Sequence, residues 1–237
     1  MQSKLATDKN FRIAIVNSKG GSGKTTLATN LASYYSCQHL KTALIDYDSQ
    51  GSSSYWVSRR PEDCPEIQLI AAYKQAINVT RGWFLRPERL TQRVVIDSPS
   101  GLDVAQFKQA LNECDAILIP VLPSSIDIHA VAHFIADVLL LGKIRREEGR
   151  IAVVANRARK NTLVYQRLEQ FLNSLGIPFV ATLRDTQQYI KASEAGKGIF
   201  EMPRVDAKDV ASWQPLLAWL KQCEDNKFRQ PQFSLEN

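Results

Sequence analysis

This sequence of 237 residues has few cysteines, no long apolar run and no internal repeat. The cysteines lie far apart, at Cys37, Cys64, Cys114 and Cys223. Because none belongs to a C-x-x-C pair, the sequence indicates neither a disulfide framework nor a cysteine-bound metal cluster. No apolar run approaches the ~18 residues that span a membrane. The start of the chain is polar and has no signal-peptide core. We therefore expect a cytoplasmic protein.

The charge is positive but not extreme. Thirty Lys and Arg residues face 24 Asp and Glu residues, which gives a net charge of +6. Such a balance permits binding to polyanions through phosphate contacts, although many basic proteins bind no nucleic acid. His129 and His133 have helical i, i+4 spacing, but no Glu follows the first His as in the H-E-x-x-H zinc motif. The histidines therefore do not predict a metal site.

The most informative segment is 17–26, which reads Asn-Ser-Lys-Gly-Gly-Ser-Gly-Lys-Thr-Thr. It lies between an apolar run, 11–16, and a helix-like stretch, 27–36. Glycines between a strand and a helix let successive N–H groups converge on phosphate oxygens, and the helix start adds a positive dipole end. We predict a nucleotide-binding loop in which Lys24 reaches the terminal phosphates and the Thr25 hydroxyl ligates Mg²⁺. The loop residues expected at the nucleotide are Lys19, Gly20, Gly21, Ser22, Gly23, Lys24, Thr25 and Thr26.

Strand and helix patterns alternate along the chain. The expected strands are 11–16, 41–46, 67–71, 93–97, 116–121, 151–156 and 178–181; the expected helices between them are 27–36, 103–112, 126–141 and 162–175. The strands are rich in Val and Ile without polar alternation, as strands buried on both faces are. The sequence therefore predicts an α/β fold, doubly wound, with a mostly parallel sheet and helices on both faces. We expect one P-loop ATPase domain over 1–237, with a polar N-terminal segment, 1–10, and a loosely held polar tail, 224–237.

Two aspartates, Asp46 and Asp97, end predicted strands and so face the crevice where the loop holds phosphate. Asp97 follows three apolar residues and suits the orientation of Mg²⁺, directly or through water. The alternative role for Asp97 is to cap a turn or helix, because residues 97–101 are also of the types that favour turns. Asp48 lies just past a strand end, where a carboxylate can position the water that attacks a γ-phosphate.

The loop, together with segments 46–51, 94–101 and 120–127, resembles the ParA/MinD family of deviant Walker A ATPases, and the resemblance covers about residues 11 to 200. It implies that Lys19 crosses a dimer interface to touch the partner's nucleotide, beside the catalytic Lys24. It also implies that Asp48 places the attacking water and that Asp46 supports the Mg²⁺ shell. The chain has Ser49 where the family has proline, which bears on the hydrolysis rate.

The resemblance is to the small ParA type, because no helix-turn-helix extension precedes the loop. The resemblance implies that ATP and Mg²⁺ are cofactors and that ATP drives formation of a homodimer. It also implies that the dimer binds double-stranded DNA without sequence specificity, so that the protein is associated with the nucleoid. A ParB-like or other cargo-adaptor protein is then expected to stimulate hydrolysis. Asn156 and Arg157 end a strand where such proteins hold adenine, although Asn156 could equally be a turn residue. The candidate DNA contacts are Lys191, Arg157, Arg159, Lys160, Lys197 and Lys221, each of which could instead be a solvated surface charge.

Two other functions share this loop. A MinD-like membrane ATPase needs a C-terminal amphipathic helix, whereas segment 228–237 contains Pro231 and lacks a repeated apolar face. The stretch 210–220 is apolar but contains Pro215, and core packing explains it better. A small-molecule ATP-dependent enzyme would need an acceptor pocket that the sequence does not reveal. We therefore expect no membrane partner, and a cargo that the sequence does not specify.

Overall fold

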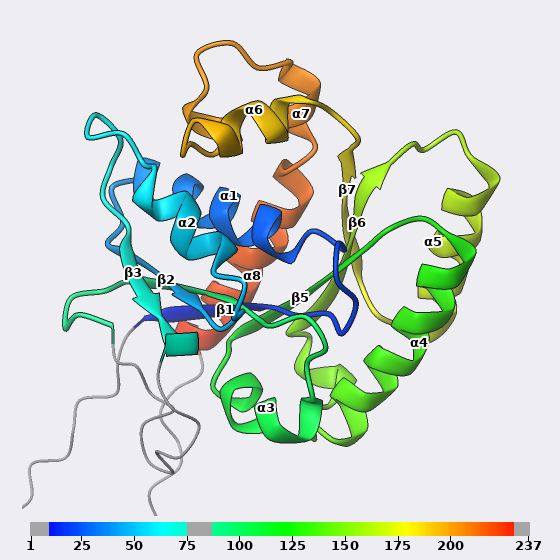
Figure 1. The fold of residues 1–237 in the computed structure, drawn as a ribbon. Coiled ribbons are helices and arrows are strands. Elements are labelled where there is room, and N and C mark those ends of the chain that lie inside the picture. Colours follow the sequence, from blue (N-terminus) through cyan, green and yellow to red (C-terminus); the bar gives the residue numbers. More distant parts are fainter. Residues whose placement is uncertain (1–9, 75–86, 230–237) are drawn as a thin grey trace, which may run out of the picture.

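The computed structural model describes residues 10–74 and 87–229, and its centre is one parallel sheet (Figure 1). The seven strands of the described residues are β1 (Phe11–Ile15), β2 (Thr42–Asp46), β3 (Gln68–Ala71), β4 (Arg93–Asp97), β5 (Ala116–Val121), β6 (Ile151–Ala158) and β7 (Phe179–Arg184). They pair in the order β3-β2-β4-β1-β5-β6-β7, and every pairing is parallel. The predicted fold class is confirmed, and each predicted strand is present with ends shifted by a few residues.

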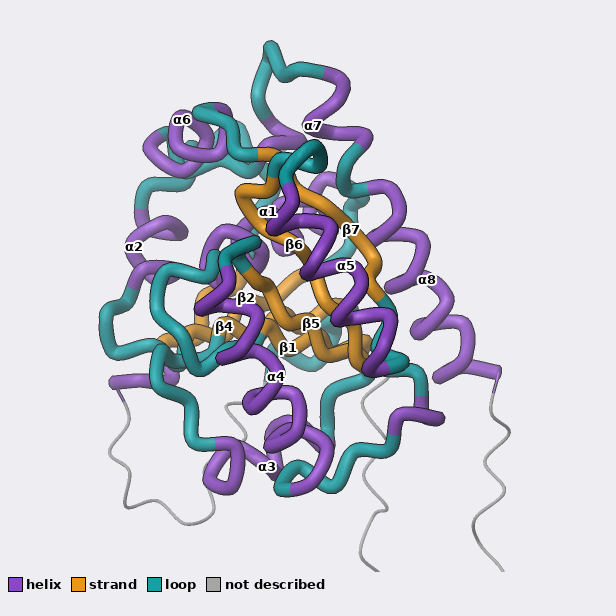
Figure 2. The backbone as a smooth tube through the Cα atoms, turned by 90° about the vertical axis from the view of Figure 1, so that its right-hand side faces the viewer, coloured by secondary structure: helices purple, strands orange, loops and turns teal. Residues whose placement is uncertain are grey.

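Helices cover both faces of this sheet (Figures 1 and 2). They are α1 (Lys24–Cys37), α2 (Ser52–Ser58), α3 (Val104–Asn112), α4 (Ser125–Leu140), α5 (Leu163–Leu175), α6 (Gln188–Glu194), α7 (Ala207–Ala211) and α8 (Gln214–Arg229). Apolar side chains of α3, α4 and α5 form a buried cluster on one face, and those of α1, α2 and α8 form a second cluster on the other. Successive strand residues point to opposite faces, so Ala14 joins the first cluster and Ile13 the second.

The C-terminal end of the described chain differs from the expectation. The tail from Glu224 was expected to be loosely held, but α8 continues to Arg229 and the Glu224 carboxylate pairs with Arg93 at 2.6 Å. Pro215 does not interrupt this helix, because it is its second residue, where a missing N–H removes no helical hydrogen bond. The expectation of a loose tail is therefore wrong for residues 224–229.

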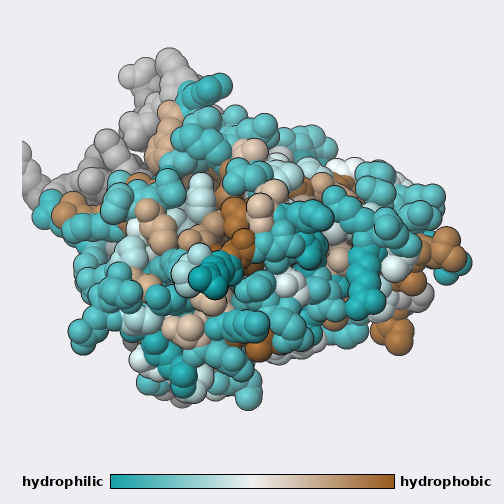
Figure 3. All heavy atoms as spheres, turned by 90° about the horizontal axis from the view of Figure 1, so that it is seen from above, coloured by the Kyte–Doolittle hydropathy of each residue, from teal (hydrophilic) through white to brown (hydrophobic). Residues whose placement is uncertain are grey.

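Three short described helices, α2, α6 and α7, and the longer helix α8 were also not predicted. Residues 1–9 and 230–237, which carry the rest of the expected polar ends, lie outside the described residues. No described helix has the combined length and hydropathy that would let it cross a membrane. In Figure 3 the face seen from above is mostly hydrophilic, with apolar atoms at the end where α4 and α5 lie in Figure 1.

Candidate functional site

The loop between β1 and α1 has the backbone geometry expected of a phosphate-binding turn. Gly21 and Gly23 adopt positive φ values of 75° and 98°, a region that side chains disfavour. Gly23 also packs against Asn156 so closely that a Cβ would lie 1.8 Å from the Asn156 Nδ2 atom. The loop is followed directly by the 14-residue helix α1, whose N-terminal N–H groups suit an anion.

Lys24 is buried at the start of α1 and forms no ion pair among the described residues. Its ammonium group donates to the Lys19 carbonyl at 3.2 Å and to Ser100 Oγ at 3.4 Å. Burial lowers the pKa of Lys24, while the charges of Asp97 and Asp48 oppose that shift. A lysine held by neutral oxygens, with carboxylates near but not bonded, is free to bind the phosphates of a nucleotide.

Asp97 ends β4 and is completely buried. Its Oδ2 atom accepts hydrogen bonds from Thr25 Oγ1 at 2.8 Å and from Ser53 Oγ at 2.7 Å. Its Oδ1 atom is buried and has no hydrogen-bond partner among the described residues. Burial raises the pKa of Asp97 to about 6, although the bonds from Ser53 and Thr25 act in the opposite direction. A buried carboxylate oxygen left unpaired beside a threonine hydroxyl fits Mg²⁺, which prefers oxygen ligands.

Asp46 lies beside Asp97, because the last residues of β2 and β4 are paired in the sheet. Its carboxylate accepts three hydrogen bonds, from the Asp48 N–H at 3.1 Å and from the N–H and hydroxyl of Ser54, both at 2.8 Å. Burial raises the pKa of Asp46. The described residues contain no group of three His, Cys, Asp or Glu that could form a metal cage, but Mg²⁺ keeps several waters and needs only one or two carboxylates.

Asp48 lies in the turn between β2 and α2, next to the loop that follows β4. Its Oδ1 atom accepts from the Gln50 N–H at 3.0 Å, and its Oδ2 atom accepts from the Ser100 N–H at 3.2 Å and hydroxyl at 3.3 Å. Gly51, with φ 63°, turns the chain into α2. The structure thus brings Asp46, Asp48, Asp97, Lys24 and Thr25 together around the loop.

Lys19 has a partner that the sequence did not reveal. Its ammonium group pairs with the Asp127 carboxylate in the first turn of α4, and the Ser124 hydroxyl binds the same carboxylate. The Lys19 side chain is 39% exposed, whereas Asp127 is buried. Within one protomer Lys19 therefore points to α4.

Asn156 lies in β6 and contacts the phosphate-binding loop. Its Nδ2 atom donates to the Ser22 carbonyl at 3.0 Å, and its Oδ1 atom accepts from the Arg157 N–H at 3.0 Å. Arg157 is exposed and has a positive φ of 49°. Contact of these two residues with adenine stays a prediction.

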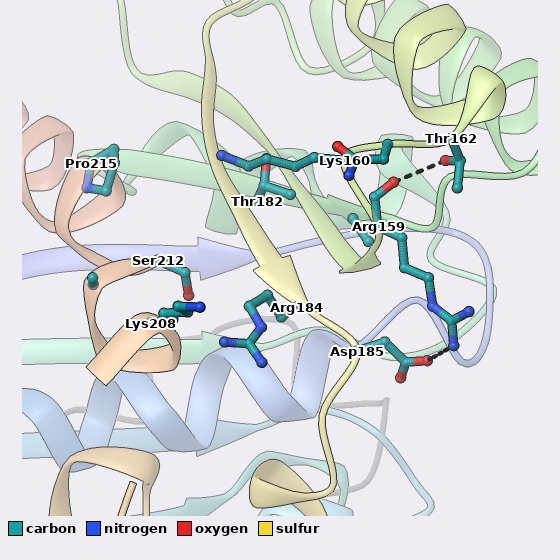
Figure 4. Close-up of a pocket in the computed structure, with 12 residues that line it drawn as sticks. Arg159, Lys160, Thr162, Thr182, Arg184, Asp185, Lys208, Ser212 and Pro215 are labelled. Carbon is teal, nitrogen blue, oxygen red and sulfur yellow. Dashed lines mark hydrogen bonds and ion pairs between the residues drawn. The ribbon is translucent and has the colours of Figure 1, made fainter. Parts of the chain in front are cut away.

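The structure sorts four of the six predicted DNA contacts into two groups. Lys197 pairs with Asp63 at 3.7 Å, and Lys221 lies within 3.3 Å of Glu224 and 3.2 Å of Asp225. In contrast, Arg159 and Lys160 line a cavity of about 770 Å³ at the carboxyl ends of β6 and β7 (Figure 4). Arg184 and Lys208, which the sequence analysis did not single out, line it too. We call these four residues the basic groove.

Acidic side chains partly neutralise the basic groove. Arg184 pairs with Asp206 at 2.8 Å and with Asp209 at 3.3 Å. Arg159 lies 3.8 Å from Asp185, and both side chains are mostly exposed. Lys160 and Lys208 form no ion pair with any described residue. Lys191 is exposed on α6 and is also unpaired among the described residues.

The parallel sheet and the loop define a class, that of the P-loop ATPases, which bind and hydrolyse ATP with Mg²⁺. Residues 13–199 match the model of the CobQ/CobB/MinD/ParA nucleotide binding domain, and the chain belongs to this family. The chain is 30% identical over 200 residues to the maintenance of carboxysome distribution protein A of Halothiobacillus neapolitanus. The matched region covers 84% of this chain and 90% of that protein.

Two solved structures share the fold. A plasmid partition protein of Borrelia burgdorferi B31 bound to AMPPNP has a TM-score of 0.69 at 20% identity and covers 90% of this chain and 99% of its own. A variant of McdA of Cyanothece in complex with ATP also has a TM-score of 0.69, at 17% identity, and covers 92% of this chain and 97% of its own. The predicted family and the ATP cofactor are confirmed.

Proposed function

We propose that this ATPase dimerises on ATP, binds double-stranded DNA without sequence specificity and positions a cargo in the cell interior, where it is associated with the nucleoid. A cargo-bound adaptor, ParB-like or of another kind, stimulates hydrolysis and releases it. The observation that carries the proposal is the match, over 90% of its length, to a protein named for maintaining carboxysome distribution. The cargo is a carboxysome-like compartment, a plasmid, a chromosome region or a protein cluster.

Hydrolysis follows from the groups gathered at the loop. Lys24, the glycines and the start of α1 bind the phosphates. Thr25, Asp97 and Asp46 would hold Mg²⁺, directly or through water, and a bound Mg²⁺ would supply positive charge to the phosphates. Asp48, held by the Ser100 N–H and hydroxyl, orients the attacking water, because phosphoryl transfer depends on positioning and charge stabilisation more than on covalent chemistry.

Dimerisation in this proposal uses Lys19. Its partner in one protomer is Asp127, so a contact with the second protomer's ATP requires this ion pair to break. The Lys19 side of this pair is 39% exposed, so solvent screens the attraction, and a triphosphate offers several negative charges in exchange. ATP between two protomers therefore favours the exchange, whereas ADP offers less charge.

DNA binding uses the basic groove together with Lys191. The groove places unpaired lysines from two separate segments, Lys160 after β6 and Lys208 in α7, around one cavity. Cations placed in this way can contact phosphates along a DNA backbone, and such contacts release counterions and weaken with salt. Lys197 and Lys221 are held in ion pairs and contribute less.

The test is anisotropy of a labelled nonspecific duplex with ATP, with ADP and without nucleotide, over a salt series. We expect binding with ATP only, and a weaker salt dependence for Lys160→Ala/Lys208→Ala, because each lost phosphate contact lowers the slope by about one. Lys221→Ala is the matched control, since its ammonium is already paired, and should bind like the wild type. Equal binding in all nucleotide states, or none with ATP, would contradict the proposal.

A further inference from the structure

The first turn of α2 presents two serine hydroxyls to the two carboxylates of the expected Mg²⁺ site. Ser53 Oγ donates to Asp97 Oδ2 at 2.7 Å, and Ser54 Oγ donates to Asp46 Oδ2 at 2.8 Å. Serines at a helix start usually cap their own helix. Here the N-cap residue is Gly51, which has no side chain that could cap the helix. Both serine hydroxyls bind carboxylates at the ends of strands β4 and β2 instead.

Ser53 is the more constrained of the two. It is completely buried, and a buried hydroxyl requires a partner. A hydroxyl can donate one hydrogen bond, and Ser53 donates its hydrogen bond to Asp97, 44 residues away in the chain. Ser54, by contrast, also binds Asp46 through its backbone N–H, and that bond does not depend on the side chain.

The hydrogen bonds of Asp97 are divided unevenly between its two oxygens. Thr25 and Ser53 both donate to Oδ2, whereas Oδ1 is buried without a partner among the described residues. Two donors that approach one oxygen from different helices, α1 and α2, fix the rotation of the carboxylate. Removal of Ser53 leaves Thr25 as the sole described donor and lets the carboxylate turn.

We propose that Ser53 is a positioning residue for ATP hydrolysis: its hydroxyl fixes Asp97 so that Oδ1 remains available to the Mg²⁺ shell, and it ties α2 to β4. Because Asp48 lies in the turn that leads into α2, the same bond sets the position of that turn relative to Asp97. This inference rests on the proposed assignment of Asp97 to Mg²⁺.

The experiment compares Ser53→Ala with Ser54→Ala and Asp97→Asn. Binding of fluorescent ADP is measured in EDTA and across a Mg²⁺ titration, together with the melting temperature without nucleotide and kcat and KM at saturating Mg²⁺. In Ser53→Ala we expect the Mg²⁺ concentration for half-maximal effect to rise roughly tenfold, as loss of a hydrogen bond to a charged group implies. ADP affinity in EDTA should stay unchanged, and kcat should fall more than KM rises. Ser54→Ala should show a smaller change, because its N–H bond remains.

The outcomes separate this inference from the proposed site. If Asp97→Asn alters the Mg²⁺ titration and Ser53→Ala does not, or if Ser53→Ala lowers only the melting temperature, the positioning role is wrong and the site stands. If Asp97→Asn leaves the Mg²⁺ titration unchanged, the site assignment fails and the inference fails with it. Should Ser53→Ala be too unstable to assay, Ser53→Cys, which keeps a weak donor of similar size, should show an intermediate shift, and an unchanged titration would overturn the role.

Discussion

At the scale of single residues, the phosphate loop depends on positions that accept no side chain. Gly23 combines a φ of 98° with an approach to the Asn156 amide that leaves no room for a Cβ. Asn156 in turn holds the loop through the Ser22 carbonyl. The glycine pattern was readable in the sequence, because it follows from the loop's own backbone. The contact with Asn156 was not, since it joins residues 134 positions apart.

Replacement of Gly23 by alanine should abolish nucleotide binding. The substitution adds backbone strain of about 1–2 kcal/mol and pushes the Asn156 amide away from the loop. Gly149→Ala is the control, because Gly149 has a φ of 65° but no atom within 4 Å of an added Cβ. Titration with fluorescent ADP checks the prediction. Wild-type affinity in Gly23→Ala would contradict it, and lost affinity in Gly149→Ala would show that a general loss of stability, and not the contact at the loop, explains the effect.

At the scale of elements, the long apolar strands could be predicted and the short polar helices could not. Strands such as β1 and β5 are buried on both faces, so their Val and Ile content identified them. The start of α2 is a run of serines, Ser52 to Ser54, and serine has weak helix propensity. The role proposed for these serines depends on carboxylates at the ends of two strands, which only the folded chain brings near. Ser100 and Asp127 were missed for the same reason, since only the folded sheet brings them to Asp48 and Lys19.

The Arg60–Glu201 ion pair joins the segment that follows α2 to the short helix η3 (Ile199–Glu201). Both side chains are nearly buried, and the Arg60 guanidinium also lies over the Trp56 ring. Burial alone would raise the pKa of Glu201, but the bonds from Arg60 and the Gly198 N–H lower it below its ordinary value of 4.5. The pair's contribution to stability is therefore fully present above pH 4.5 and is lost as the pH falls through the lower pKa of the folded state.

Glu201→Gln should lower the free energy of unfolding at pH 7 by about 3 kcal/mol, because it leaves Arg60 buried without its counter-charge. The difference from the wild type should shrink as the pH falls below 4.5. Urea unfolding across this pH range measures both effects. Glu148→Gln, which removes a more exposed pair with Arg150, should change stability by less than about 1 kcal/mol. Equal losses in the two variants would contradict the account.

At the scale of the whole molecule, the sheet order explains how the site is assembled. β4 lies between β2 and β1, so Asp46, Asp97 and the phosphate loop meet at the carboxyl ends of these three neighbouring strands. This arrangement follows from the parallel pattern that the sequence showed. The basic groove was only half predictable, because Arg184 and Lys208 join Arg159 and Lys160 through the packing of α7 beside β7 (Figure 4).

The central claim is that ATP held by the loop brings two copies of the chain together. Sedimentation velocity of Asp48→Ala tests it most directly, because we expect loss of the proposed water-positioning carboxylate to block turnover and so to preserve the ATP. With ATP and Mg²⁺ we expect a dimer, with ADP a monomer, and for Lys19→Ala/Asp48→Ala a monomer in both conditions. A monomer of Asp48→Ala with ATP bound, or a dimer that forms without nucleotide, would contradict the account.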